Sequence, residues 1–183
     1  MHAFGFGSHK DPDSGFTRNW ILSQKDNFVI RKERVILPQL FQEVAQFYEE
    51  VIKSKNNQIT IESADGNVLF TDPNMLKVIV RNLVDNANKY TQDGYLRISS
   101  IQEGDAMKIS IADTGKGMSS EKLQKLTSLF GMVNEFGDEF QGNFGFKIIK
   151  DFLNLLEASI EFSSELNSGT TVTLTFPNRT QNG

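Results

Sequence analysis

The fold is decided by the stretch Val78-Ile-Val-Arg-Asn-Leu-Val-Asp-Asn-Ala-Asn-Lys-Tyr-Thr91. At 3.6 residues per turn, its residues and Leu76 divide into an apolar helical stripe and a neighbouring polar stripe. The apolar stripe contains Leu76, Ile79, Val80, Leu83, Ala87 and Tyr90, and the polar stripe contains Asn82, Asn86 and Lys89. Because asparagine destabilises a helix by roughly half a kcal/mol relative to alanine, this concentration of amides favours a role other than helix formation.

The polar stripe has the chemistry of a site for magnesium and phosphate. Mg²⁺ takes oxygen ligands and keeps waters and substrate phosphates in its shell. The neutral amide oxygens of Asn82 and Asn86 would not repel those phosphates as carboxylates would, and Lys89 adds a positive charge. A solvated, Asn-rich helix face would explain the same pattern, so the rest of the chain has to decide between the two.

Length, composition and charge exclude several classes of protein. A chain of 183 residues with 38% hydrophobic content suits one globular domain with a core. The net charge of -4 gives no basic field for nucleic acid or an anionic membrane. With no cysteine and no apolar run of about 18 residues, we expect a soluble cytoplasmic piece, whether or not its parent protein is anchored in a membrane.

Hydrophobic patterns along the chain predict an α+β fold. Strands are expected at 35–37, 58–62, 67–71, 95–101, 107–112, 159–163 and 171–176, and helices from Pro38 to Ile52, from Pro73 through the stretch above, and from Phe146 to Leu156. Asp72 precedes Pro73 and is expected to cap the second helix rather than to catalyse. This order, with antiparallel hairpins, predicts a two-layer α/β sandwich in which a mixed sheet packs on about three helices.

Residues 113–145 contain six glycines and no sustained strand pattern. So long a segment is rare inside a compact domain unless it is functional, so we expect a long lid loop here. Residues 1–18 are predicted to be a flexible arm or a cloning remnant, and 179–183 a tail. Asn19–Gln24 has the pattern of the last turns of an amphipathic helix.

Three further motifs carry candidate chemistry. Asp113-Thr-Gly-Lys-Gly117 follows a strand, where a carboxylate can accept a hydrogen bond from an amine and the glycines let a flat ligand approach the backbone. Gly142-Asn-Phe-Gly-Phe146 leads into a helix, whose free N–H groups can bind an anion. Gly169-Thr170 enters the last strand. Asp-Thr-Gly is also typical of aspartic peptidases, which would require a dimer here.

In this order the motifs resemble those of the GHKL ATPase superfamily, and within it the catalytic domain of bacterial sensor histidine kinases. The resemblance covers about Trp20 to Pro177. It implies a Bergerat-type ATP-binding fold over 35–178, preceded at 19–34 by the end of a dimerisation helix and a linker. It further implies ATP and Mg²⁺ as cofactors, a histidine-bearing dimerisation domain and a response regulator as partners, and a homodimeric parent anchored in the inner membrane.

The resemblance also implies roles for individual residues. It assigns Asn86 to Mg²⁺ with Asn82 beside it, Lys89 to phosphate, Tyr90 to the adenine ring, Asp113 to the adenine amine, Gly115 and Gly117 to the pocket wall, Thr170 to a water-mediated link with Asp113, Gly142, Gly145 and Phe146 to the second glycine box, and Met118 to Gln141 to the ATP lid. The acceptor histidine is absent, because His2 and His9 lie in the arm.

Two departures from the family pattern keep alternatives open. Gln141 and Asn143 stand where the second glycine box has glycines, and no Arg or Lys occurs between Leu126 and Gln141. Charge neutralisation would then fall to Lys89, the metal, and Lys116 or Lys147. A nucleotide-binding pseudokinase, a regulator of the anti-sigma-factor kind and, more remotely, a dimeric aspartic peptidase are the competing interpretations.

Overall fold

The computed structural model describes residues 29–131 and 144–177. The predictions for the arm, for Asn19–Gln24, for Gly142 and for the tail from residue 179 lie outside these residues. From Arg31 onward the described residues belong to one compact unit. In the described residues, no helix combines the length and the apolar character that crossing a membrane requires.

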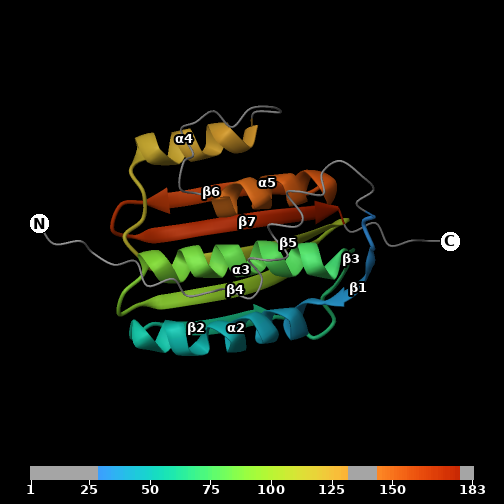
Figure 1. Ribbon diagram of the computed structural model, residues 1–183, viewed down its shortest axis with the longest axis horizontal. Coiled ribbons are helices and arrows are strands. Elements are labelled where there is room, and N and C mark those ends of the chain that lie inside the picture. The colour runs from blue at the N-terminus through green and yellow to red at the C-terminus, as the bar shows by residue number, and fades with distance from the viewer. Residues whose placement is uncertain (1–28, 132–143, 178–183) are drawn as a thin grey trace, which may run out of the picture. The chain divides into compact units, whose positions relative to one another are not determined.

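Seven strands and four helices make up the described chain (Figure 1). They are β1 (Glu33–Ile36), α2 (Leu37–Ser54), β2 (Gln58–Ser63), β3 (Val68–Thr71), α3 (Pro73–Tyr90), β4 (Tyr95–Glu103), β5 (Ala106–Asp113), α4 (Ser120–Gly131), α5 (Phe144–Leu155), β6 (Ser159–Glu165) and β7 (Gly169–Pro177). Five strands form a sheet in the order β2-β4-β5-β7-β6, and β1 pairs with β3 in a second, two-stranded sheet. Only β2 and β4 run parallel in the large sheet, which is therefore mixed as expected.

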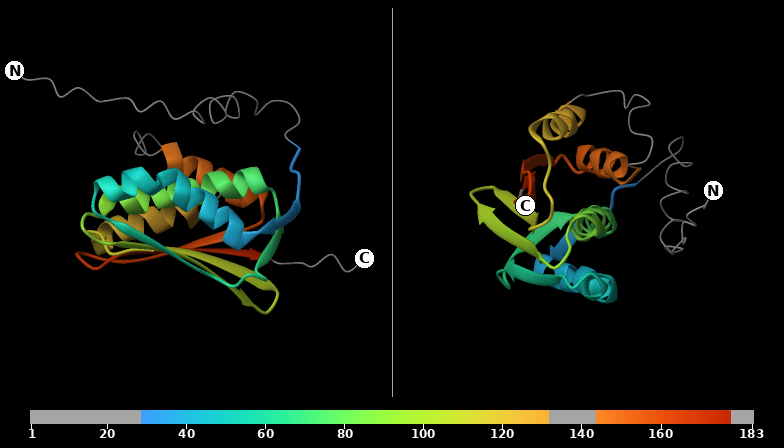
Figure 2. Two further views of the ribbon diagram at one scale, coloured as in Figure 1. Left: turned by 90° about the horizontal axis from the view of Figure 1, so that it is seen from below. Right: turned by 90° about the vertical axis from the view of Figure 1, so that its left-hand side faces the viewer.

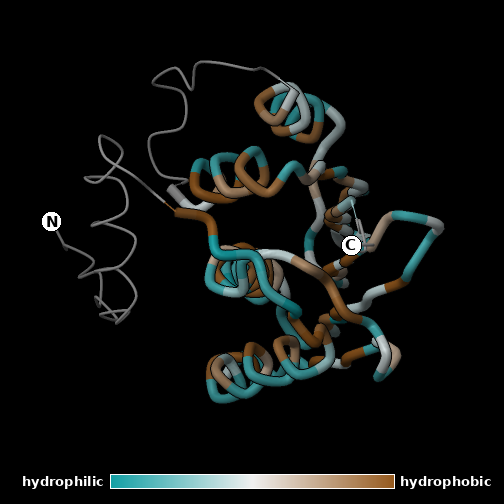
Figure 3. The backbone as a smooth tube through the Cα atoms, turned by 90° about the vertical axis from the view of Figure 1, so that its right-hand side faces the viewer, coloured by the Kyte–Doolittle hydropathy of each residue, from teal (hydrophilic) through white to brown (hydrophobic). Residues whose placement is uncertain are grey.

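All four helices lie on one face of the large sheet, so the fold is a two-layer sandwich as predicted (Figure 2). The helices carry hydrophobic and hydrophilic residues together (Figure 3), as amphipathic helices that cover a sheet do. Alternate strand residues are buried beneath them, among them Leu96 and Ile98 of β4 and Ile109 and Ile111 of β5. Because side chains alternate across a strand, one face of the sheet supplies the core.

Helix α3 is the central helix of this layer and follows the sequence closely. The Asp72 carboxylate accepts hydrogen bonds from the backbone N–H groups of Asn74 and Met75, at 3.0 and 3.1 Å, and from that of Arg31 at 3.0 Å. Asp72 is therefore a helix cap, as predicted. The predicted apolar stripe is buried at Leu76, Ile79, Val80, Leu83 and Ala87, whereas Tyr90 is only half-buried.

The C-terminal end of α3 is held by a buried amide network. Asn57 Nδ2 donates to Asn88 Oδ1 at 2.8 Å and to the Thr91 carbonyl at 3.0 Å, and its Oδ1 accepts from Gly94 N at 2.9 Å. Lys55 Nζ donates to the last carbonyls of the helix, including that of Asn88. These buried hydrogen bonds explain the asparagine at position 88, since buried amide groups need such partners.

The structure corrects two predictions. Residues 120–131, expected within a loop, form helix α4, because Leu123, Leu126 and Phe130 recur at helical spacing and Leu126 is buried. Helix α5 begins at Phe144, two residues earlier than predicted, so Gly145 lies inside it. The predicted strands at 58–62 and 67–71 are both present, and they belong to different sheets, because β2 pairs with β4 while β3 pairs with β1.

Candidate functional site

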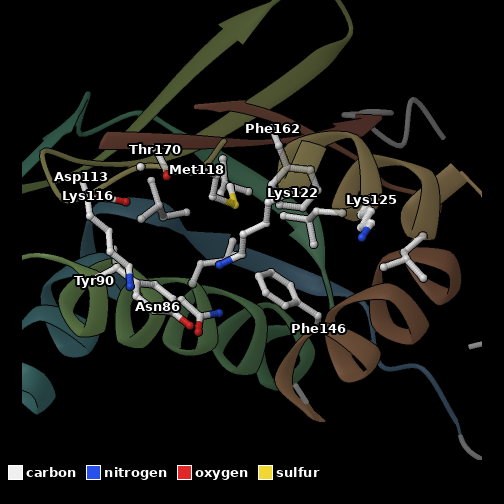
Figure 4. Close-up of a pocket in the computed structure, with 17 residues that line it drawn as sticks. Asn86, Tyr90, Asp113, Lys116, Met118, Lys122, Lys125, Phe146, Phe162 and Thr170 are labelled. Carbon is white, nitrogen blue, oxygen red and sulfur yellow. The ribbon is translucent and has the colours of Figure 1, made fainter. Parts of the chain in front are cut away.

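A cavity of about 430 Å³ lies between α3, α4, α5 and the strands β5 and β7 (Figure 4). Six of the predicted site residues line it, namely Asn86, Tyr90, Asp113, Gly117, Phe146 and Thr170. Apolar side chains such as Leu83, Ile111 and Val172 also line it. A concave, mostly apolar cavity with a few polar groups is the usual form of a small-molecule site.

Asp113 ends β5 and lies directly opposite Thr170 of β7. Gly115 N donates to Asp113 Oδ1 at 2.8 Å. Burial raises the pKa of the Asp113 carboxyl above its ordinary value, and the Gly115 N–H group, which donates to it, partly opposes this rise. This hydrogen bond holds the carboxyl in place as an acceptor on the cavity wall.

The loop after Asp113 passes too close to its neighbours for side chains. Gly117 has a φ of 60°, and an added Cβ would collide with the Glu165 carbonyl. A Cβ on Gly115 would collide with the Tyr90 carbonyl, to which Lys116 N donates at 3.1 Å. Only glycine allows this close approach at both positions, and at Gly117 it also adopts the left-handed backbone conformation without strain.

Two polar residues of α3 face this loop across the cavity. Figure 4 shows Asn86 and Tyr90 opposite Asp113 and Thr170. Asn86 brings a neutral amide oxygen, the donor type that suits Mg²⁺ carried by phosphates. The α3 helix therefore contributes both a flat ring and a candidate metal ligand to the same cavity.

Lysines from three elements gather near the Tyr90 ring. The Nζ atoms of Lys116, Lys122 and Lys89 lie 4.8, 5.5 and 5.5 Å from its centroid, within the range of a cation–π contact. Lys116 and Lys122 line the cavity, as does Lys125 of α4. Positive charge therefore comes from α4, before the Leu126–Gln141 segment that has no basic residue.

Aromatic contacts attach α4 to the neighbouring elements. The Phe130 ring lies 6.0 Å from that of Phe146 on α5 and 5.1 Å from that of Phe162 on β6, measured between centroids. Phe146 and Phe162 are also 6.2 Å apart and both line the cavity. This cluster places the α4 lysines at the cavity.

The other predicted site residues lie beside the cavity or outside the described chain. Asn82 is next to α5, where a Cβ on Gly145 would be 2.7 Å from its Oδ1, and its Nδ2 donates to the Val78 carbonyl at 2.7 Å. Asn82, Lys89, Gly115 and Gly145 do not line the cavity. The α4 residues Lys122 and Lys125 were missed, although the Glu121–Lys125 pair at i, i+4 spacing indicates a helix there.

Comparison with known proteins places these features in a wider context. The sequence profile of the family described as histidine kinase-, DNA gyrase B-, and HSP90-like ATPase matches residues 71–180, more than half of the chain. Two curated relatives are the autoinducer 2 sensor kinase/phosphatase LuxQ of Vibrio parahaemolyticus, 28% identical over 167 residues, and the histidine protein kinase SaeS of Staphylococcus epidermidis, 30% identical over 149 residues. The alignments cover 84% and 78% of this chain but only 19% of LuxQ and 42% of SaeS. The chain thus spans less than half the length of these relatives.

A solved structure supports the fold independently. Full-length ShkA in complex with AMPPNP aligns with a TM-score of 0.72 at 17% identity, over 90% of this chain and 34% of the ShkA chain. At this identity the likeness is evidence for the architecture, and it agrees with a five-stranded mixed sheet packed on helices.

Proposed function

Because the chain belongs to the family of histidine kinase-, DNA gyrase B- and HSP90-like ATPases, we propose that it is the ATP-binding catalytic domain of a bacterial sensor histidine kinase. It binds Mg-ATP in the cavity, and the γ-phosphoryl passes to a histidine on a separate dimerisation domain. The observation that carries this proposal is that Asp113, Thr170 and Asn86, from three elements, line one cavity. This cavity offers a base-reading end and a metal-binding end.

The base lies at the end of the cavity formed by the glycine loop. The Asp113 carboxylate accepts a hydrogen bond from the exocyclic amine of adenine, and Thr170 lies beside it on β7. The close backbone approach at Gly115 and Gly117 leaves room for a flat ring. Tyr90 supplies an aromatic side chain to the same wall.

The phosphates lie toward Asn86 and the lysines of the cavity. Asn86 would hold Mg²⁺, and the bound metal would supply charge neutralisation at the phosphates. Lys122 and Lys125 line the cavity from α4 and take the place of a basic residue in the later part of the lid. Phosphoryl transfer depends mainly on such positioning and charge stabilisation, so the acceptor histidine has to be brought to this end.

The proposal extends to partners and location. The named relatives are sensor kinases and histidine kinases, so we place the phosphoryl group on the histidine of a homodimeric parent and then on a response regulator. The domain works in the cytoplasm, where ATP is available, while other segments of the parent anchor it in the inner membrane. Nucleic acid is not a partner, given the net charge of -4.

Calorimetry of ATP binding with and without Mg²⁺ tests the proposal, followed by transfer of labelled phosphate to the histidine-bearing domain of the same parent. We expect binding that Mg²⁺ strengthens and an acid-labile phosphate on the added domain. Absence of nucleotide binding would overturn the proposal.

A noncatalytic nucleotide-binding module is the second candidate. The observation that favours it is the second glycine box, where Gln141 and Asn143 replace glycines. Nucleotide binding without any transfer to the histidine-bearing domain would support this candidate. The aspartic peptidase interpretation is not retained, because the chain belongs to an ATPase family and Asp113 faces Asn86 in one cavity.

A further inference from the structure

Ser164 of β6 connects three parts of the site and has no assigned role in it. Its Oγ lies 2.9 Å from Met118 N, the residue after Gly117. It also lies 2.9 Å from the Gly169 carbonyl oxygen and 2.9 Å from Thr170 Oγ1. One hydroxyl therefore contacts the first residue of the lid segment and the strand that faces Asp113.

Only one arrangement of protons satisfies all three contacts. A hydroxyl has one proton to donate and two lone pairs to accept with. The Met118 N–H occupies one lone pair, and the Gly169 carbonyl can only accept, so Ser164 donates its proton there. The remaining contact then requires Thr170 to donate to Ser164. The Thr170 oxygen consequently presents only lone pairs to the cavity.

The glycine loop before Met118 is also bound by the β6–β7 hairpin. Asn167 N donates to the Lys116 carbonyl at 2.8 Å, one residue before Gly117. Gly117 itself lies against the Glu165 carbonyl. The β6–β7 hairpin thus binds the glycine loop at two points. Asn167 in the turn contacts Lys116, and Ser164 in β6 contacts Met118.

We propose that Ser164 is a positioning residue, which fixes the Thr170 hydroxyl as a hydrogen-bond acceptor toward the base and anchors the start of the lid segment. The inference rests on the proposed nucleotide-binding function. With the Asp113 carboxylate and the Thr170 lone pairs side by side, the base-reading end accepts hydrogen bonds, directly or through water. It therefore favours a 6-aminopurine, which donates there, over a 6-oxopurine, which presents an acceptor.

The test compares the affinities for ATP and ITP in four proteins by calorimetry with Mg²⁺. In Ser164→Ala the Thr170 proton is free to turn toward the cavity, so the ATP/ITP preference should fall by about three- to tenfold, the effect of one neutral hydrogen bond. Ser164→Thr keeps the hydroxyl and should retain the preference. Ser110→Ala is the matched control, because Ser110 Oγ and Thr173 Oγ1 form a similar pair at 3.1 Å and neither residue lines the cavity.

A second measurement reports the lid anchor without any ligand. Amide hydrogen exchange of Met118 should accelerate in Ser164→Ala and stay at the wild-type rate in Ser164→Thr and Ser110→Ala. If the alanine variant does not fold, Ser164→Cys keeps the shape of the side chain with a poor hydrogen-bonding atom and serves in its place.

The outcomes separate this inference from the proposed function. If the wild-type protein binds ATP and Ser164→Ala has the same ratio of ATP to ITP affinity, the role of Ser164 is overturned and the proposed function stands. A wild-type protein that binds neither nucleotide overturns the proposed function and the base-reading role with it.

Discussion

Replacement of Asp113 by Asn is expected to weaken nucleotide binding without weakening the folded domain at neutral pH. Burial raises the pKa of this carboxyl from its ordinary value of 3.8. The folded protein therefore binds the proton more tightly than the unfolded chain does, and the free energy of unfolding falls as pH rises through that folded pKa. An amide does not titrate, so the variant lacks this fall and should gain stability relative to wild type as pH increases.

The expected loss of affinity follows from what the carboxylate does in the cavity. A hydrogen bond to a charged group contributes roughly 1.5–3 kcal/mol, which is about 10- to 150-fold in Kd at about 1.4 kcal/mol per decade. One carboxyl oxygen already accepts from Gly115 N at 2.8 Å. The single oxygen of Asn can still accept from Gly115 N. Its NH₂ group would then face the adenine amine, donor against donor, so we expect the upper part of this range.

Calorimetry with ADP in the absence of Mg²⁺ isolates the base-reading end, and thermal melting from pH 4.5 to 8 measures the stability difference. Asp105→Asn is the control, because Asp105 is exposed in the β4–β5 turn and the substitution removes the same charge. Equal affinities of the two variants would refute the role of Asp113. A stability difference that does not grow with pH would refute the argument from burial.

The remaining predictions concern the loop, the metal, the core network and catalysis. Gly117→Ala should lower the free energy of unfolding by more than about 1–3 kcal/mol, because the φ of 60° alone costs that much and an added Cβ would also collide with the Glu165 carbonyl; an unchanged melting temperature would contradict this. Asn86→Ala should abolish the Mg²⁺-dependent part of nucleotide affinity and leave adenosine binding unchanged, and calorimetry showing equal Mg²⁺ enhancement in both proteins would exclude Asn86 as a ligand. Asn57→Ala should cost about 1–3 kcal/mol in urea denaturation, because its buried partners lose their hydrogen bonds; a loss below 0.5 kcal/mol, roughly the size of a surface change, would count against the network. The chain incubated with labelled ATP should carry no acid-labile phosphate, and label at His2 or His9 would disprove this, whereas its histidine-bearing domain should become labelled when added.

Much of the fold could be predicted because its signals are local. The α3 stripe, the Asp72 cap and the alternation of the strands are each set by neighbours within a few residues. Three of the residues that line the cavity from α3 and β5, namely Asn86, Tyr90 and Asp113, were predicted, since they stand at fixed points of well-defined elements.

What was missed depends on contacts between distant residues. The parallel pairing of β2 with β4 joins strands separated by β3 and α3, and no local pattern reports it. Glycines on both sides of 120–131 favoured a loop, whereas packing of Leu126 and Phe130 stabilises helix α4. Lys122 and Lys125 reach the cavity only because that helix forms, and the contacts of Ser164 exist only after β6 and β7 pair.

The cavity walls come from segments near residues 86, 113 and 170, which meet only when β5 has paired with β7. Loop-closure entropy opposes such long-range pairing, so the pairing needs the surrounding structure to stabilise it. A chain in which β5 and β7 have not paired therefore lacks the complete cavity. Any ligand of the cavity binds only the complete fold, so its stabilisation grows as RT ln(1 + [L]/Kd) and the melting temperature rises with ligand concentration.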